Sequence, residues 1–112
     1  MDFTVIANAV YVDHGIKRLS MRFVKKYAAP ERARLSAELC DQITEELDKA
    51  GLITIPKQLP TSENEFVFII EKKSPLGQAV SIASAFTNLD RLGASPLPEL
   101  FAQFPDARKF LI

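Results

Sequence analysis

Few residues of this chain combine the types and spacing that chemistry requires. His14 is the only histidine and stands beside Asp13, a pair that can in principle transfer a proton. No nucleophile lies at a recognisable spacing from it, and the start of a helix is the simpler role for Asp13, His14 and Gly15. Phosphate-loop, dinucleotide-binding, zinc-protease and Gly-x-Ser-x-Gly motifs are absent. We therefore predict no catalytic residue, no metal site and no cofactor.

Cys40 is the only cysteine, so it has no partner within the chain for a disulfide. It falls on the apolar side of a predicted helix, which favours a buried side chain over a reactive thiol. The absence of a disulfide framework favours a reducing compartment, and we predict a cytoplasmic protein. Only Met1 and Asp2 precede the apolar opening of the chain, so no signal peptide is predicted.

Charged side chains are unevenly placed, although fourteen basic residues balance fourteen acidic ones. Positions 13 to 34 hold seven basic and two acidic residues, whereas positions 35 to 65 hold seven acidic and two basic ones. A net charge of zero gives no overall attraction to nucleic acid or membrane, so any attraction must come from this segregation. The candidate partner-binding charges are the basic stripe Arg18, Arg22, Lys25 and Lys26, and the acidic residues Glu38, Asp41 and Glu45.

Two roles are open for the basic stripe. In an antiparallel helical hairpin across Pro30, Arg22 would lie near Glu38 and Arg18 near Asp41, forming surface ion pairs. Alternatively, the stripe binds phosphates or an acidic partner.

A third group of candidates is apolar and lies near the end of the chain, where it docks on its own domain or anchors a partner. These residues are Phe101, Phe104 and Phe110.

The elements that position these residues are mostly helical. Apolar residues recur at three- and four-residue spacing from Val5 to Tyr27, which predicts helices over 3–12 and 14–28, interrupted at Asp13–Gly15. A third helix is predicted over 30–50, with the apolar side chains Leu35, Leu39, Ile43 and Leu47 facing inward. Gly51 is expected to end that helix in the left-handed conformation, with Leu52 folded back on Leu47.

A β-hairpin is predicted over 52–72, because two β-branched or aromatic runs, 52–55 and 65–72, flank a polar loop. Both faces of the second run are apolar, so something must cover each of them. A helix is predicted over 75–92, with a hairpin strand at 78–86 as the alternative, and a short helix follows over 95–104. No run of apolar residues is long enough to span a bilayer.

A length of 112 residues fits a single domain. We predict one mostly helical α+β domain over 1–112, helical over 3–50, with a two-stranded antiparallel β element and a helical C-terminal extension over 75–112. Residues 35–71 resemble the second half of a winged helix, in which a recognition helix ends at Gly-Leu-Ile and leads into a two-stranded wing. The helix in that position presents acidic residues, which DNA phosphates would repel.

The combined pattern favours a non-catalytic protein–protein interaction module, such as an adaptor, an inhibitor or an assembly subunit, using its charged helical faces and the apolar C-terminal segment. Self-association is one form of this function. The alternative is a nucleic-acid-binding regulator of the winged-helix type that contacts backbone phosphates through a basic helix over 16–28. A small enzyme of unrecognised type is the third hypothesis. Neither a membrane nor a metal is among the predicted partners.

Overall fold

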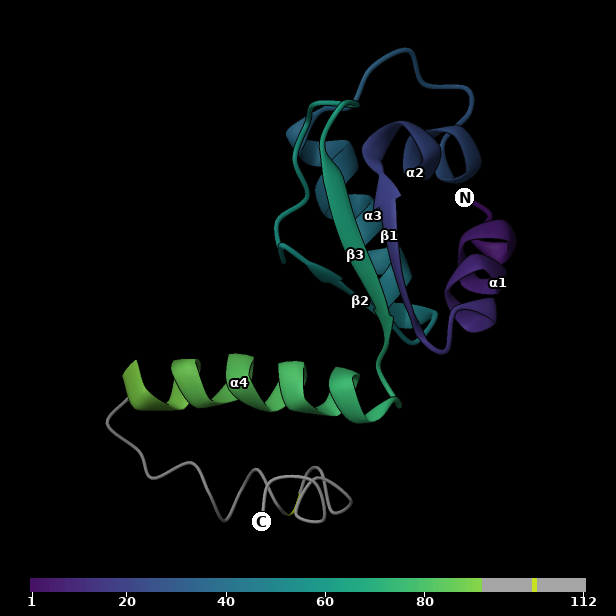
Figure 1. The fold of residues 1–112 in the computed structure, drawn as a ribbon. Helices are drawn as coiled ribbons and strands as arrows, with labels where there is room; N and C mark the ends of the chain where they lie inside the picture. Colours follow the sequence, from purple (N-terminus) through teal and green to yellow (C-terminus); the bar gives the residue numbers. More distant parts are fainter. Residues whose placement is uncertain (92–101, 103–112) are drawn as a thin grey trace. The chain divides into compact units, whose positions relative to one another are not determined.

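The computed structural model describes residues 1–91 and Ala102 (Figure 1). The chain divides into two compact units, Met1–Glu71 and Lys72–Ile112. Unit 1, Met1–Glu71, contains three helices and a three-stranded sheet, whereas the described part of unit 2 contains helix α4, Pro75–Arg91. The organisation of residues 1–112 as one domain stays a prediction. The short helix predicted over 95–104 lies outside the described residues.

The α+β class is confirmed, and the sheet of unit 1 is larger than predicted. Its strands are antiparallel in the order β1-β3-β2, so β3 lies between the other two (Figure 1). The pairing of 52–55 with 66–71 is confirmed, but the two-stranded prediction is wrong because Ile16–Ser20 adds a third strand. In chain order the elements of unit 1 are α1 (Thr4–Val12), β1 (Ile16–Ser20), α2 (Met21–Ala28), α3 (Ala37–Lys49), β2 (Leu52–Ile55) and β3 (Phe66–Glu71).

The helix predicted over 14–28 is wrong for residues 14–20, because a turn and then β1 lie there. The continuous helical region predicted over 3–50 is wrong for the same residues. His14 and Gly15 have φ angles of 63° and 93° and end α1 instead of starting a helix. The His14 N–H donates to the carbonyl of Tyr11, and the Gly15 N–H donates to that of Val10. These two bonds form a Schellman motif, which satisfies the last carbonyls of α1 and turns the chain into β1.

Helix α2 begins at Met21 and is capped by Ser20, whose hydroxyl accepts a hydrogen bond of 3.1 Å from the Phe23 N–H. This cap lies in the middle of the segment that the apolar spacing assigned to one helix. Leu19 lies in β1 and Phe23 in α2, which follows directly. Because the two residues are four positions apart, the apolar spacing typical of a helix continues across the strand by coincidence. The spacing also misplaced the inner face of α1, where Ile6 and Val10 are buried while Val5 is exposed.

Helix α3 begins at Ala37 and not at residue 30, because the hydroxyl of Ser36 caps it by accepting from the Leu39 N–H. Residues 29–36 therefore form a loop between α2 and α3. The predicted inner residues Leu39, Ile43 and Leu47 are buried, as is Leu35 in the loop before the helix. In unit 2, α4 confirms the helix predicted from residue 75, and the alternative strand at 78–86 is wrong.

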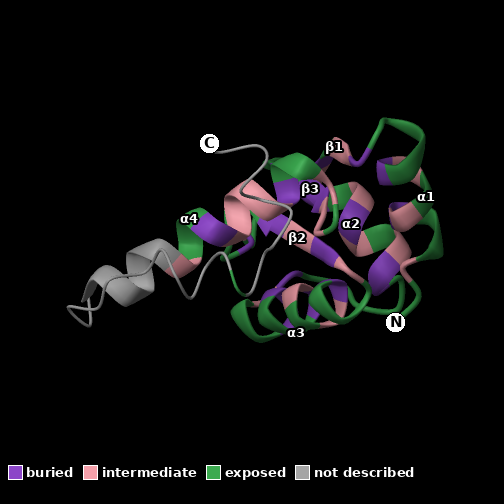
Figure 2. Cartoon of the chain, turned by 90° about the horizontal axis from the view of Figure 1, so that it is seen from below, coloured by how far each residue is buried: buried purple, intermediate pink, exposed green. Residues whose placement is uncertain are grey.

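The core of unit 1 lies between its helices and one face of the sheet, the inner face (Figure 2). Helix α3 contacts β2, α1 contacts β1 and β3, and α2 contacts β1. Because side chains alternate along a strand, Leu19, Val67 and Ile69 face this core while their sequence neighbours occupy the opposite, outer face. The element order of unit 1 is helix, strand, helix, helix, strand, strand, and α3 is followed by the β2–β3 hairpin, as predicted for residues 35–71.

Gly51 follows α3 with a φ of 81°, as expected from the sequence, and its N–H donates to the carbonyl of Asp48. A Cβ added there meets no atom within 4 Å, so Gly51→Ala would introduce backbone strain without a steric clash. We expect this substitution to lower the free energy of unfolding by about 1 kcal/mol, which urea denaturation would measure. Ala50→Gly, which exchanges the same two residue types in the opposite direction at the neighbouring position, is the control. If the Gly51→Ala protein were as stable as the parent, this result would contradict a positive φ at residue 51.

Candidate functional site

The four residues of the basic stripe do not lie on one helix. Arg18 is on the outer face of β1, whereas Arg22, Lys25 and Lys26 are on α2. The proposed basic helix over 16–28 is therefore wrong for residues 16–20. The predicted hairpin pairs are not formed either: among the described residues, no ion pair joins Arg22 to Glu38 or Arg18 to Asp41.

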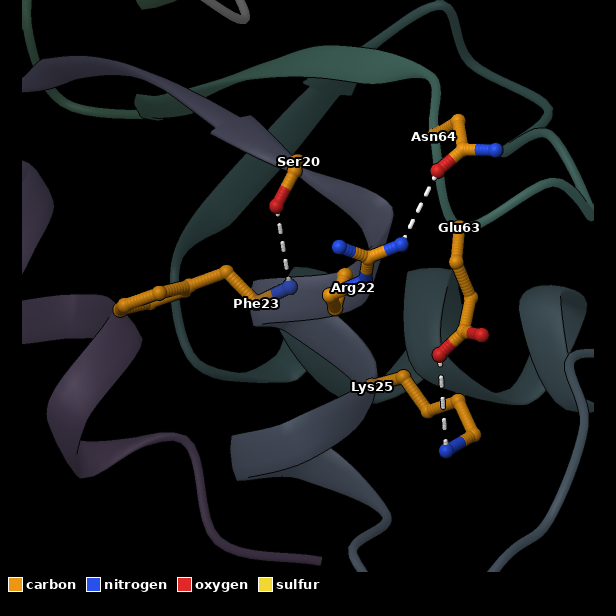
Figure 3. A network of polar contacts seen from close by, with 6 residues as sticks. All are labelled: Ser20, Arg22, Phe23, Lys25, Glu63 and Asn64. Atoms are coloured by element: carbon orange, nitrogen blue, oxygen red, sulfur yellow. Dashed lines mark hydrogen bonds and ion pairs between the residues drawn. The ribbon is translucent and has the colours of Figure 1, made fainter.

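Arg22 and Lys25 instead hold the loop between β2 and β3, residues 56–65 (Figure 3). A guanidinium N–H of Arg22 donates to Asn64 Oδ1 over 3.0 Å, and Lys25 Nζ lies 3.6 Å from Glu63 Oε1. The backbone of α2 adds two bonds, because the N–H groups of Met21 and Arg22 donate to the carbonyls of Glu65 and Glu63. Two members of the basic stripe thus have a structural role within unit 1.

Breaking the Lys25–Glu63 pair should cost little. The Lys25 side chain is only 14% exposed, but that of Glu63 is 40% exposed and the two charged atoms are 3.6 Å apart, so water reaches the carboxylate and weakens the pair. We expect Lys25→Met, which keeps the aliphatic stem, to lower the free energy of unfolding by about 0.5 kcal/mol at low salt and by less at high salt. Lys57→Met, at an exposed position, is the control. A loss above about 2 kcal/mol would show that this ion pair is more than a surface contact.

The acidic candidates Glu38, Asp41 and Glu45 lie where the sequence predicted them, on the exposed side of α3 (Figure 2). Their carboxylates share this surface at helical spacing, so α3 presents a negative face. A face of this charge repels DNA phosphates and would favour a basic partner.

The outer face of the sheet exposes apolar side chains that sequence reasoning did not select as candidates. Phe66 is 50% exposed, Phe68 42% and Ile55 41%. Ile55 pairs with Phe68 across β2 and β3, and Arg18 pairs with Phe68 from β1, so these side chains share one surface. The guanidinium carbon of Arg18 lies 3.9 Å from the centroid of the Phe66 ring. The signal was present in the sequence, because both faces of the strand are apolar.

Cys40 and His14, the two residues considered for chemistry, both have structural roles. Cys40 is buried, and its thiol donates to the carbonyl of Pro60 over 3.4 Å, which ties α3 to the loop between β2 and β3. Burial raises the pKa of the Cys40 thiol, so at neutral pH it stays protonated and is a poor nucleophile. His14 occupies the left-handed position of the turn after α1. Among residues 1–91, no three histidine, cysteine or carboxylate side chains are grouped to hold a metal ion.

Comparison with known proteins adds no relative. No protein-family model, curated protein or solved structure matches this chain.

None of the helices in the described part of the chain has the length and apolarity needed to cross a membrane. The apolar candidates Phe101, Phe104 and Phe110 lie outside the described residues.

Proposed function

We propose that this protein is a non-catalytic protein–protein interaction module, an adaptor, inhibitor or assembly subunit, that binds its partner through the outer face of the sheet. One observation supports this most strongly: Ile55, Phe66 and Phe68 are each 41–50% exposed on one continuous surface. Grouped apolar side chains on a protein surface mark interaction sites, since their burial releases water. Aromatic residues and arginine also dominate the binding energy of protein interfaces.

The acidic face of α3 supports the same function in a different way. Exposed charges contribute mainly to the rate of encounter and to the choice of partner. Glu38, Asp41 and Glu45 would therefore speed association with a basic surface, while the sheet face would supply most of the affinity. In this proposal the charged helical face assists an apolar site on the sheet.

A nucleic-acid-binding regulator is the second candidate, because the element order of unit 1 resembles a winged helix. Lys26, Arg32 and Arg34 are exposed and would be available to phosphates. Against it, Arg22 and Lys25 are engaged by Asn64 and Glu63, and α3 is acidic.

The test compares the proteins that the full chain and two variants capture from a lysate of the native host. Phe68→Thr removes an aromatic ring from the outer face and keeps a strand-favouring residue. Tyr11→Gln is the control, because Tyr11 is exposed on α1, away from the sheet face. We expect a reproducible set of proteins to be captured by the parent and Tyr11→Gln after nuclease treatment, and to be lost with Phe68→Thr. Equal capture by all three forms would contradict the proposal, and loss on nuclease treatment would favour the nucleic-acid hypothesis.

A further inference from the structure

The outer face of the sheet carries a single charge. On the outward positions of β1, β2 and β3, Arg18 is the only ionisable residue; the others are isoleucine, phenylalanine and Ser20. Arg18 is exposed and lies directly opposite Phe68 across the two strands. The outer face therefore has one positive charge, on the edge strand β1, and no negative charge, and Ile70 on the same face is buried.

The guanidinium of Arg18 is oriented but not neutralised. It lies over the ring of Phe66 at 3.9 Å, the distance of a cation–π contact, which limits the rotamers available to the side chain. Among the described residues, no carboxylate lies within ion-pair distance of it. An arginine that stacks on a ring keeps its N–H groups in the plane of the guanidinium, where they can bind both oxygens of a carboxylate.

From this arrangement we infer the chemistry of the partner: an apolar peptide segment with an aspartate or glutamate beside its apolar side chains. The carboxylate binds the N–H groups of Arg18, and the apolar side chains cover Phe68 and Ile55. This inference rests on the proposed function and specifies its partner. The complementarity is one negative charge for one positive charge, with apolar contact beside it over β3 and β2.

Two other occupants fit this face less well. A second copy of the chain, packed outer face to outer face, would bring a second Arg18 and no carboxylate, leaving two positive charges in an apolar interface. A single-stranded nucleic acid needs open aromatic rings for its bases, but Arg18 already covers one face of Phe66. One arginine would also neutralise a single phosphate, which gives weak attraction.

The experiment selects binders from a library of displayed random peptides, using the full chain as bait and the Arg18→Glu chain for counter-selection. We expect the enriched peptides to carry Asp or Glu beside Leu, Ile, Val or Phe. The strongest peptide is then synthesised with its acidic residue kept, changed to the amide, or changed to Arg, and titrated with each protein. Thermal melting first checks that each variant is folded.

Loss of the carboxylate or Arg18→Gln should each weaken binding about tenfold or more, and Arg18→Lys should weaken it less. Phe68→Thr should also weaken binding, whereas Arg32→Gln, which removes an exposed arginine in the loop before α3, should not. Arg18→Glu should bind the Arg-containing peptide better than the acidic one, because the two changes together restore opposite charges.

Other results overturn the inference in distinguishable ways. Peptides that depend on Phe68 but carry no acidic residue, or that ignore Arg18, would overturn the partner chemistry and leave the proposed function standing. A selection in which no binder depends on Phe68 or Ile55 would overturn both. Self-association in sedimentation that Phe68→Thr abolishes would assign the face to a second copy. A mixed-sequence oligodeoxynucleotide that binds more tightly than any peptide, and whose binding is lost with Phe68→Thr, would assign the face to nucleic acid.

Discussion

Ile69→Ala should lower the free energy of unfolding by about 3–4 kcal/mol, whereas Ile55→Ala should lower it by about 1 kcal/mol or less. The two substitutions delete the same atoms from neighbouring strands of one sheet. Ile69 is fully buried on the inner face of β3, so its loss leaves a cavity that the surrounding core fills only in part. Ile55 is 41% exposed on the outer face of β2, where solvent occupies the vacated space.

Urea denaturation of the parent and both variants would measure this difference, and an unchanged denaturant slope would confirm that the folded and unfolded states are comparable. The pair also tests the surface on which the proposed function depends. If Ile55→Ala cost as much as Ile69→Ala, the outer face would be covered in the protein in solution and would not be available to a partner.

The second large effect concerns duplex DNA. The parent chain should show no binding in the range of specific complexes, Kd of about 10⁻⁸ to 10⁻¹¹ M, near physiological salt. The variant Glu38→Lys, Asp41→Lys, Glu45→Lys replaces three negative charges with positive ones on the exposed face of α3. We expect it to gain non-specific binding with a Kd of about 10⁻⁶ to 10⁻⁴ M, because phosphate contacts dominate this affinity.

A mobility-shift titration at fixed salt would measure both affinities, and repeating it at several salt concentrations would give the number of phosphate contacts. The matched control changes the same three residues to Gln, which removes the repulsion without adding cations, and its affinity should lie between the other two. Nanomolar binding by the parent, unaffected by the reversal, would contradict the argument and would place a DNA-binding surface away from α3.

The elements that the sequence predicted correctly are those with strong local signals. The helix over 75–91 follows from apolar spacing, and the end of α3 follows from Gly51 in the left-handed position. The helix over 4–12 was also predicted, but from a spacing that placed Val5 and not Ile6 on its inner face. The pairing of 52–55 with 66–71 follows from two strand-forming runs joined by a polar loop. The acidic face of α3 was also correct, because hydrophobic spacing alone places Glu38 and Asp41 opposite the core.

Strand β1 was decided by tertiary structure. Its five residues pair with β3 some fifty positions along the chain, and no local signal records a partner that far away. Local caps at Gly15 and Ser20 bracket the strand, but the four-residue spacing of Leu19 and Phe23 outweighed them. The error moved Arg18 from a helix to a sheet, and with it from a predicted ion pair to the ring of Phe66.

The sequence by itself determined that this is an α+β chain with balanced, segregated charges and a strand apolar on both faces. Which face of that strand helices would cover was decided only in the folded chain. Phe66, Phe68, Val67 and Ile69 are equally apolar, so their order does not distinguish the two sides. Helices of unit 1 bury Val67 and Ile69, and the burial of those side chains leaves the two phenylalanines on the exposed surface beside Arg18.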